Sequence, residues 1–418
     1  MAPGKTSLLA LGALLVVLLG LPLMLSPDLV GAFSKMLVWA LFALAFSLLI
    51  GQAGMLSFGH AAYFAVGCFA TIHAMNAVQS GLISIPTPLL PLTGAIAALL
   101  AGTLAGFFAT LRSGVYFSMV TLAIAELLHT LAPNLHSVFG GEVGVSSMRQ
   151  PWAGIGFGSE IEVYYLVLAW VVVSALALHL YRHTSFGRLT VALRENEKRI
   201  AFLGYNVHLT KMMVFSVSSL FAGVAGSLLA LTNESANYLL FDLSYSANVV
   251  LYSFIGGVGT FLGPAIGAAL MTLFGHTVSE MTRLWLLYQG LIFVLVMMYA
   301  PSGIAGFVEL QVRQIARGEG WSLARRALVV IPVVMIAAST VFLCEMVATI
   351  FARDYQSQLE RSGKWALVKL FRSSWAPDAV LTWAVPMAVL AGGIVLLSWL
   401  FRPGAGTALT VPSAGAQK

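Results

Sequence analysis

Long apolar runs dominate this chain and limit what it can fold into. Most of them reach the 18 or more residues that a membrane-crossing helix needs. Hydrophobic residues make up 59% of the 418 residues and charged residues only 9%, whereas ordinary soluble domains carry about 25% charged residues. So little polar surface cannot cover a water-soluble fold. The sequence therefore predicts an all-α polytopic membrane protein.

The apolar runs predict ten spans in a core that ends near residue 310, followed by two more in a C-terminal extension. The first run, Leu8–Leu25, is interpreted as a retained span, because no small-residue cleavage site follows it. The eighth and ninth spans are short and interrupted by glycine. The predicted ranges are 7–25, 36–50, 57–75, 90–111, 114–132, 162–181, 212–231, 246–257, 262–275, 285–301, 327–349 and 380–400.

Basic residues between the spans predict the orientation of the chain, because cytoplasmic loops are enriched in Lys and Arg. The segment 182–211 is the most charged connection and is placed inside. Six spans precede it, so the N-terminus is inside as well. Arg313–Arg326 is cytoplasmic only if the eighth and ninth spans both cross. The net charge of +6 is therefore explained by topology and gives no indication of a nucleic-acid partner.

The C-terminal extension, 311–418, is expected to hold two transmembrane helices and a disordered tail, 403–418. Residues 350–379 fall outside by this count, where the positive-inside bias disfavours their basic residues. They would form an interfacial amphipathic helix; the alternative is that span 327–349 is misplaced. The residues expected to share the apolar face of that helix are Leu367, Val368, Phe371 and Trp375.

Two similar hexapeptides suggest an inverted repeat, which is a common device of transporters. GQAGML, Gly51–Leu56, ends the second span, and GVAGSL, Gly223–Leu228, lies in the seventh, which runs the other way. However, IGGVGTF, Ile255–Phe261, also resembles the first hexapeptide and does not fit this symmetry. A chance match in a glycine-rich chain stays open as the alternative.

The segment RHTSFGRLTVALRENEKRIAFLGYN, residues 182–206, concentrates charge in an otherwise apolar chain. Glu195 lies three and four residues before Lys198 and Arg199, a spacing that supports a short helix. Apolar residues stand between the charges: Leu193, Ile200, Ala201 and Leu203. A surface helix with one charged and one apolar face is typical of a docking element. The alternative is a cytoplasmic loop that only fixes the topology.

This segment resembles the cytoplasmic coupling loop of the branched-chain amino acid ABC transporter permeases. Other blocks resemble the same family: GQAGMLSFGHAAYFAVGCFA from Gly51, GVYFSMVTLAIAELLH from Gly114, and GGVGTFLGPAIGAAL from Gly256. The resemblance covers about residues 7–310. The matching coupling-loop residues are Arg194, Glu195, Asn196, Glu197, Ala201, Leu203, Gly204 and Asn206.

The resemblance implies the transmembrane permease subunit of an ATP-driven importer of branched-chain or other hydrophobic amino acids. It implies a coupling helix at 194–204, in which Glu195 and Glu197 pair with basic groups of the ATPase and Gly204 ends the helix in a left-handed turn. Its partners would be a second, different permease subunit, two ABC ATPase subunits, an extracytoplasmic binding protein and membrane lipid. The location would be the bacterial inner membrane.

The chain itself is expected to be no enzyme and to bind no cofactor, so that ATP and Mg²⁺ belong to the ATPase. Ala2–Thr6 contains Gly-Lys-Thr, but it lacks the leading glycine and the preceding strand of a phosphate-binding loop.

Two features of this sequence depart from the family pattern. Phe139 stands where the family has a threonine before Gly-Gly, and residues 311–418 have no counterpart.

Polar residues inside the spans are candidates for the translocation path. Gln52, Ser57 and His60 surround the Gly51–Gly54 break, whose exposed backbone groups need protein or water. Glu126 lies deep in the fifth span, where an acid is costly unless it faces protein or water. Ser219 and Gly223 belong to a small-residue ladder that either packs helices or lines a moving interface. For each of them a structural role is the alternative, and no metal site is expected.

Two other functional classes remain to be weighed against an amino-acid importer. A permease for urea or short amides would share the same motifs. An ion-coupled secondary transporter is the other alternative, but such carriers place acidic residues in mid-membrane, and only Glu126 qualifies here.

Overall fold

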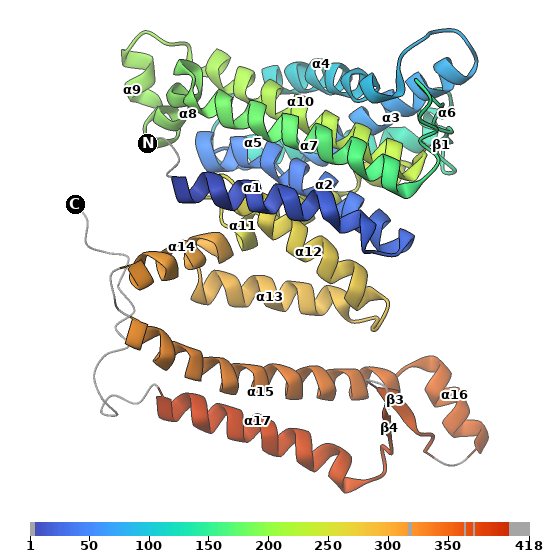
Figure 1. Ribbon diagram of the computed structural model, residues 1–418, viewed down its shortest axis with the longest axis vertical. Coiled ribbons are helices and arrows are strands. Elements are labelled where there is room, and N and C mark those ends of the chain that lie inside the picture. Colours follow the sequence, from blue (N-terminus) through green and yellow to red (C-terminus); the bar gives the residue numbers. More distant parts are fainter. Residues whose placement is uncertain (1–4, 317–319, 363–364, 371–372, 401–418) are drawn as a thin grey trace. The chain divides into compact units, whose positions relative to one another are not determined.

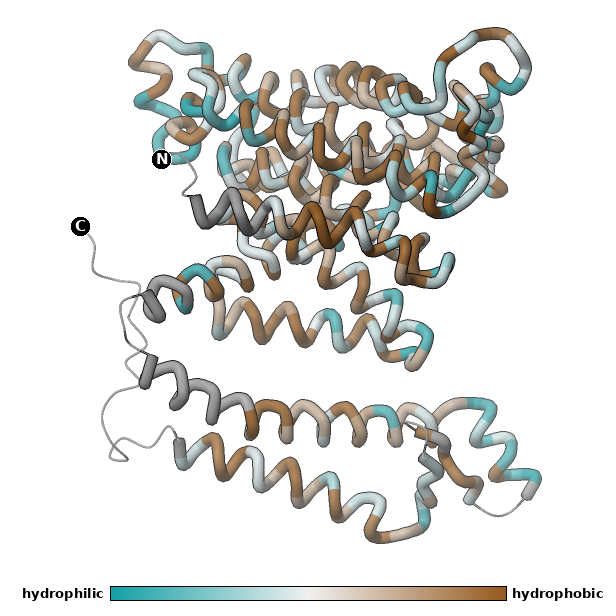
Figure 2. Tube along the Cα trace, in the orientation of Figure 1, coloured by the Kyte–Doolittle hydropathy of each residue, from teal (hydrophilic) through white to brown (hydrophobic). Residues whose placement is uncertain are grey.

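The computed structural model describes residues 5–316, 320–362, 365–370 and 373–400 (Figure 1). Its contacts divide the chain into two compact units, Met1–Val308 and Glu309–Lys418, and each is described by itself. The predicted disordered tail, 403–418, lies outside the described residues. Apolar residues fill the middle of the helices and polar residues gather at the ends (Figure 2), as expected for helices that cross a bilayer.

The N-terminal unit is a bundle of helices, which confirms the predicted all-α membrane fold. Its longer helices are α2 (Pro27–Ser47), α3 (Ala61–Gln79), α4 (Pro91–Ala109), α5 (Val115–Leu131), α7 (Glu160–His183) and α10 (Val207–Asn233). Its shorter elements are α1 (Lys5–Gly20), α6 (His136–Phe139), α8 (Ser185–Glu195), α9 (Glu197–Phe202), α11 (Leu243–Gly256), α12 (Gly263–Ser279), α13 (Trp285–Tyr299) and α14 (Gly303–Ala316).

The predicted spans all coincide with helices, but not every helix has the length of an ordinary span. Within the described residues, eight helices are long and apolar enough to cross a membrane, or nine if the bent pair α13–α14 counts as one. The exceptions are α1, α11, α12 and α13, with 16, 14, 17 and 15 residues. The core therefore combines full-length and short helices, and the predicted short eighth and ninth spans correspond to α11 and α12.

The second span was predicted to begin at residue 36, but α2 begins at Pro27. The helix begins at Pro27 because its first turn tolerates Asp28, whose carboxylate favours a helix N-terminus. Lys35 is exposed and does not interrupt the buried face. At its other end α2 widens into a π-helix, Leu48–Ala53, which Gly54 terminates in the left-handed conformation with φ +68°. The predicted break at Gly51–Gly54 is confirmed.

Helix α10 is the centre of the bundle, with 83% of its span buried. It packs mainly against α4 and α3, and small residues make this close approach possible. A Cβ atom added at Gly223 would overlap Ala98 and the backbone of Gly94, and one at Gly226 would overlap the Phe64 carbonyl. The small-residue pattern of α10 is therefore a packing device in this structure, like those that join membrane helices elsewhere.

Helices α11 and α12 form an antiparallel hairpin held by glycine contacts. Cβ atoms at Gly256 and Gly267 would each overlap backbone atoms of the opposite helix. The loop that joins the two helices also meets two other breaks of the bundle. A Cβ atom at Gly51 would lie 2.8 Å from the Val258 carbonyl oxygen, and one at Gly257 would overlap Ser302 at the α13–α14 junction. Three breaks thus meet at one end of the bundle.

The opposite end carries a small antiparallel ladder, β1 (Val145–Ser146) with β2 (Ser235–Ala236). Arg149 fastens this loop to the end of α10. Its Nε lies 3.0 Å from Oε1 of Glu234, and its Nη1 donates to the Leu231 carbonyl at 2.9 Å. Glu234 itself adopts a left-handed φ of 53°.

The two similar hexapeptides, which suggested an inverted repeat, have different local structures. Gly51–Leu56 lies at the end of a helix, and Gly223–Leu228 lies inside one.

The C-terminal unit pairs α15 (Gly320–Ile350) with α17 (Val380–Leu400) and connects them by α16 (Arg353–Ser362) and a hairpin of β3 (Val368–Leu370) with β4 (Ser373–Trp375). The prediction of an amphipathic helix through Leu367 and Trp375 is wrong, because these residues flank and end the hairpin. Trp375 instead packs its ring 4.9 Å from that of Phe342, and the Tyr355 hydroxyl donates to the Ala366 carbonyl at 2.7 Å. The connection is a small folded cap.

Candidate coupling site

The charged segment forms two helices, so the predicted single helix at 194–204 is wrong. Helix α8 ends at Glu195, and Asn196 is extended with φ −161°. The Asn196 side chain then accepts a hydrogen bond from the Arg199 amide at 3.1 Å and caps α9. Asparagine favours this cap over the helix interior because its side chain competes for backbone partners. The Arg-Glu-Asn-Glu motif is therefore a corner between two helices.

The end of α9 matches the prediction for Gly204, which has φ +86°. The Gly204 amide donates to the Ala201 carbonyl and the Tyr205 amide donates to the Ile200 carbonyl. This pair of bonds is the Schellman motif, which needs a residue with positive φ. Asn206 follows at once and caps α10 through the Leu209 amide at 3.0 Å. The turn between α9 and α10 is thus fixed by backbone hydrogen bonds at the end of α9 and by the Asn206 side chain at the start of α10.

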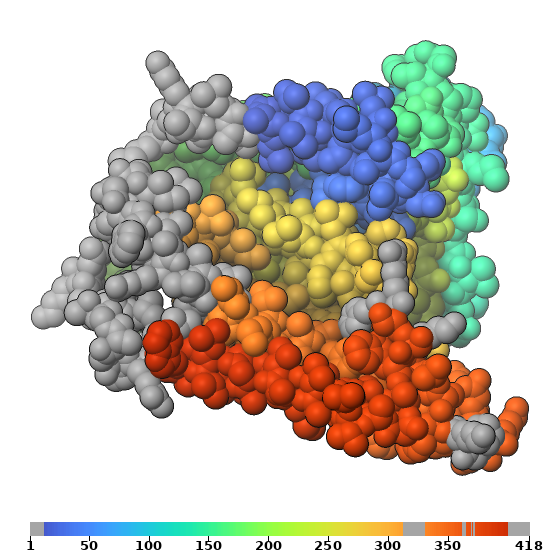
Figure 3. Space-filling view, turned by 60° about the horizontal axis from the view of Figure 1, so that its bottom comes forward, coloured from blue at the N-terminus to red at the C-terminus, as the bar shows by residue number. Residues whose placement is uncertain are grey.

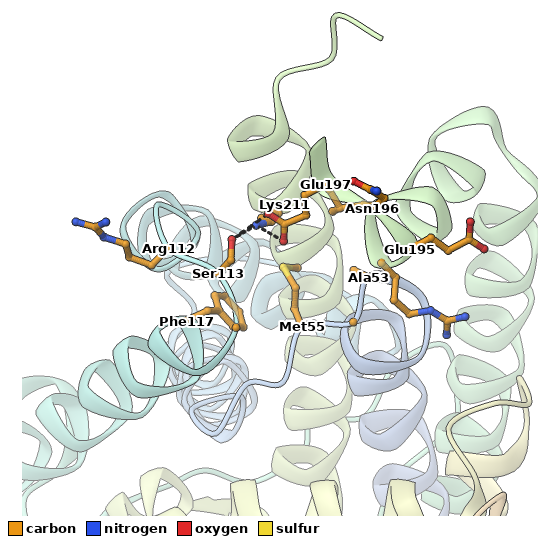
Figure 4. Close-up of a pocket in the computed structure, with 13 residues that line it drawn as sticks. Ala53, Met55, Arg112, Ser113, Phe117, Glu195, Asn196, Glu197 and Lys211 are labelled. Carbon is orange, nitrogen blue, oxygen red and sulfur yellow. Dashed lines mark hydrogen bonds and ion pairs between the residues drawn. The ribbon is translucent and has the colours of Figure 1, made fainter. Parts of the chain in front are cut away.

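Glu197 has its partners within the chain. Its Oε1 lies 2.6 Å from Nζ of Lys211, whose side chain is only 3% exposed. Its Oε2 accepts a hydrogen bond from the Ser113 hydroxyl at 3.0 Å, and Lys211 donates to the same hydroxyl. Figure 4 shows these three side chains converging. Glu197 therefore joins α9 to α10 and to the α4–α5 loop, whereas its predicted role was to meet the ATPase.

Arg194 and Gln52 join the same corner to the break in α2. Arg194 donates from Nη1 to the Gly51 carbonyl. A Cβ atom at Gly54 would lie 2.7 Å from Cγ of Arg194, so the arginine stem lies directly over this glycine. The Thr190 hydroxyl of α8 donates to the Gln52 side chain at 3.4 Å. Gln52 thus lies next to the coupling segment, buried at the end of α2.

These contacts surround a cavity of about 240 Å³ between the α2 break, the α4–α5 loop and the α8–α9 corner. Four of the predicted coupling residues line it, namely Arg194, Glu195, Asn196 and Glu197. Ala201 and Gly204 do not and are exposed. Glu195 and Arg112 point away from the pocket in Figure 4. The structure therefore assigns the two glutamates different positions, Glu197 inside the corner and Glu195 at its outer surface.

An exposed apolar tip follows α9. Leu193 and Ile200, two of the four predicted apolar residues, are buried at 1% exposure and fix the helices to the bundle. Leu203 is 67% exposed, and its neighbours Phe202 and Tyr205 are 90% and 53% exposed. Sequence reasoning missed the two aromatic residues. Their signal was present, since large aromatics in a charged loop have no membrane to face and are enriched at protein interfaces.

Ser57 and His60, predicted near the translocation path, are fully buried. The His60 ring lies among Phe42, Phe46, Tyr63 and Phe215, with centroid distances of 5.7–6.0 Å. Its Nε2 lies 3.0 Å from the Ser218 hydroxyl, which itself donates to the Ala45 carbonyl. The histidine must then donate this bond, and its buried Nδ1 has no partner. In this conformation these residues join α2, α3 and α10.

The other predicted path residues lie in two different environments. Ser219 and Gly223 are buried between α10, α3 and α4. Glu126 is instead exposed on the outer face of α5, a helix of which only 28% of the span is buried. One turn further, Nε2 of His129 lies 3.9 Å from Oδ2 of Asp242. A role in the translocation path stays a prediction for each of the candidates, which are Gln52, Ser57, His60, Glu126, Ser219 and Gly223. In the described part of the chain, no His, Cys, Asp and Glu side chains cluster as a metal site.

Comparisons with known proteins identify the family. A family model described as the permease component of the branched-chain amino acid transport system matches residues 29–301. The high-affinity branched-chain amino acid transport permease LivM of Salmonella typhimurium is 26% identical over 329 residues, covering 73% of this chain and 76% of LivM.

Two further relatives are also transport permeases. A probable LivM of Methanocaldococcus jannaschii is 25% identical and covers 65% of the chain. The ribose import permease RbsC of Haemophilus influenzae is 26% identical and covers 49%. No solved structure matches the chain. The membrane helices and the match over residues 29–301 show that this multi-pass protein of the bacterial inner membrane belongs to the branched-chain amino acid transport permease family.

Proposed function

We propose that this chain is the transmembrane permease subunit of an ATP-driven importer and that a separate ATPase drives it through α8 and α9. The observation that carries the proposal is the apolar tip at Phe202, Leu203 and Tyr205, which is exposed although the segment behind it is bonded firmly to the bundle. An exposed apolar surface on such a rigid loop marks a protein interface.

The bonds behind the tip explain how a push on α9 reaches the membrane helices. Arg194 holds the corner to the α2 break, and Glu197 holds it to Lys211 on α10 and to Ser113 before α5. A displacement of the tip therefore acts on three membrane helices together. Glu195 is exposed beside the corner and is available to pair with a basic group of the ATPase.

The ATP and Mg²⁺ of the cycle belong, in this proposal, to two ATPase subunits, while an extracytoplasmic binding protein delivers the substrate. A second permease subunit is inferred from α5. Glu126 carries a carboxylate on an outward face of this helix, and a charge inside a membrane must face protein or water. A second subunit that covers α5, with a path between the two, meets this requirement for Glu126.

The proposed substrate is a branched-chain or other hydrophobic amino acid. Relatives named as branched-chain amino acid permeases cover 65% to 73% of the chain. Relatives named as ribose or galactose permeases cover 33% to 49%. The named amino-acid permeases therefore match over a larger share of the chain than the named sugar permeases, which supports an amino acid over a sugar. Urea and short amides stay the alternative substrates.

Co-purification tests the docking surface. Leu203→Asp should abolish capture of the co-expressed ATPase by this chain, because a charge in an apolar interface is costly. The control is Leu82→Asp, since Leu82 is also exposed, at 82%, but lies at the opposite end of the bundle, after α3. Equal capture by both variants would refute the assignment of the tip.

Substrate identity needs a separate measurement. The cognate binding protein is screened by thermal shift against hydrophobic amino acids, urea and short amides, and the best ligand is followed as radiolabelled uptake. Stabilisation by leucine, isoleucine or valine supports the proposal. Stabilisation by urea or an amide alone contradicts it.

A further inference from the structure

A second cavity, of about 300 Å³, lies on a different part of the N-terminal unit. It is formed by α2, α11, α12 and α13 and contains none of the residues assigned to coupling or to the path. Aromatic rings make up much of its wall, and Trp39 stacks on Tyr245 with centroids 5.6 Å apart. The lining residues are Trp39, Tyr245, Asn248, Tyr252, Met271, Thr272, Gly275, His276, Ser279 and Trp285.

The ends of three helices place this cavity at the extracytoplasmic end of the bundle. Tyr245 lies in the first turn of α11, His276 and Ser279 in the last turn of α12, and Trp285 at the start of α13. The coupling corner contacts the other end of the α11–α12 hairpin through Gly51 and Val258. Tryptophan and tyrosine are enriched at this level, where lipid headgroups begin.

The surface beside the cavity is apolar. Residues on the outer faces of α12 and α13 are large and exposed: Ile266 at 40%, Leu270 at 47%, Leu286 at 60%, Leu287 at 52% and Leu291 at 42%. Figure 3 shows the atoms of α11 to α13, in yellow, exposed beside the blue N-terminal helices. Such a surface is suited to acyl chains, and the cavity opens beside it.

Each polar side chain of the lining can donate a hydrogen bond, and the hydroxyl and imidazole groups can also accept one. Oδ1 of Asn248 accepts a hydrogen bond from the Gln289 side chain at 3.2 Å, and the Asn248 amide group is a further donor. The Thr272 hydroxyl is buried and has no partner. Indole, phenol and imidazole groups add further donors. No Asp, Glu, Lys or Arg side chain is among the lining residues.

We propose that this cavity binds one phospholipid of the outer leaflet. The ester carbonyl and phosphate oxygens of a phospholipid accept hydrogen bonds, and the unpartnered Thr272 hydroxyl and the other donors of the lining can supply them. Its acyl chains would lie along the apolar faces of α12 and α13. Aromatic faces suit an alkylammonium headgroup as well, since cations are attracted to Trp and Tyr rings.

Native mass spectrometry of the complex with its partner subunits tests this binding, with dioleoyl phosphatidylethanolamine added in detergent. The wild type should retain one phospholipid. Thr272→Val removes the orphaned hydroxyl and should weaken retention about tenfold, since one lost hydrogen bond is worth roughly this factor. Thr277→Val is the matched control, because Thr277 lies on the same helix but outside the lining, and it should retain lipid normally.

A variant whose side chain fills the cavity provides the second test of lipid binding. A Cβ atom at Gly275 would lie 3.5 Å from the Trp285 ring, an ordinary contact, so Gly275→Val should fold while its methyl groups occupy the space. This variant should lose the lipid yet elute and melt like the wild type; if it does not fold, Gly275→Ala replaces it. Unchanged retention in Thr272→Val and in the filled variant, displacement of the lipid by leucine, or occupancy by detergent alone would each overturn the proposal.

Discussion

The ion pair of Glu197 and Lys211 provides a sharp test of the coupling site. The side chains meet at 2.6 Å, with Lys211 3% and Glu197 42% exposed. Exposed pairs contribute about 0.2–1 kcal/mol to stability, whereas breaking a buried pair costs about 3–5 kcal/mol. Since one partner is buried and the other is partly hydrated, Glu197→Gln should cost about 2 kcal/mol, mainly by leaving the ammonium group without a counter-charge.

Lys211→Met should cost less, about 1 kcal/mol, because Glu197 can be hydrated and methionine replaces the buried stem of the lysine. The double variant should resemble Lys211→Met, since neither charge is then left buried and unpaired. The two substitutions are therefore expected to be non-additive by about 2 kcal/mol. Glu142→Gln is the matched control, since Glu142 is exposed and lies between α6 and β1, at the opposite end of the bundle.

The assay compares ATP hydrolysis and uptake in proteoliposomes that contain the partner subunits. Glu197→Gln should insert normally but transport less substrate for each ATP, because α9 is no longer held to α10. The double variant should recover part of that ratio, and the control Glu142→Gln should keep the wild-type ratio. Wild-type uptake by Glu197→Gln, or simple additivity in the double variant, would refute the reasoning.

Three further predictions concern the rest of the chain. Gly223→Val should impair assembly by at least about 1–3 kcal/mol through overpacking, whereas Ser219→Ala should elute and transport almost normally, because its hydroxyl bonds Phe215 of its own helix. In a variant lacking the native cysteines, Leu310→Cys should resist an impermeant thiol reagent in intact cells, and ready labelling would contradict a cytoplasmic α14. Truncation after Leu310 should retain partial uptake, and loss of uptake by a normally assembled chain would assign the C-terminal unit to the mechanism.

The positions of the helices follow well from the sequence because hydrophobicity alone determines them. The misplaced start of α2 shows the limit of that argument. Asp28 and Lys35 interrupt the apolar run, but a first-turn acid and an exposed lysine are both compatible with a helix. Glycines predicted the break after Gly51 correctly, since a residue at φ +68° is favourable only without a side chain.

The sequence indicated that the charged segment 182–206 is helical, but its internal geometry could not be predicted. The spacing of Glu195 to Arg199 predicted one helix, whereas Asn196 caps a second one. Nothing local reveals that Glu197 pairs with Lys211, 14 residues further along, or with Ser113, 84 residues before it. Such partners come from tertiary packing. The exposure of Glu126 is equally invisible in one chain, because it depends on what covers α5.

The meeting of three helix breaks behind the coupling corner explains why the sequence places glycine at each. A break exposes backbone carbonyls that need partners inside a membrane protein, and here Arg194 satisfies the one at Gly51. Gly51 in turn touches the Val258 carbonyl, and Gly257 touches Ser302. Backbone lies against backbone at these two points, whereas the Arg194 side chain joins α8 to Gly51. In the proposed mechanism, a displacement of α8 would pass through Arg194 to α2 and on to the α11–α12 hairpin, while Lys211 would carry it to α10.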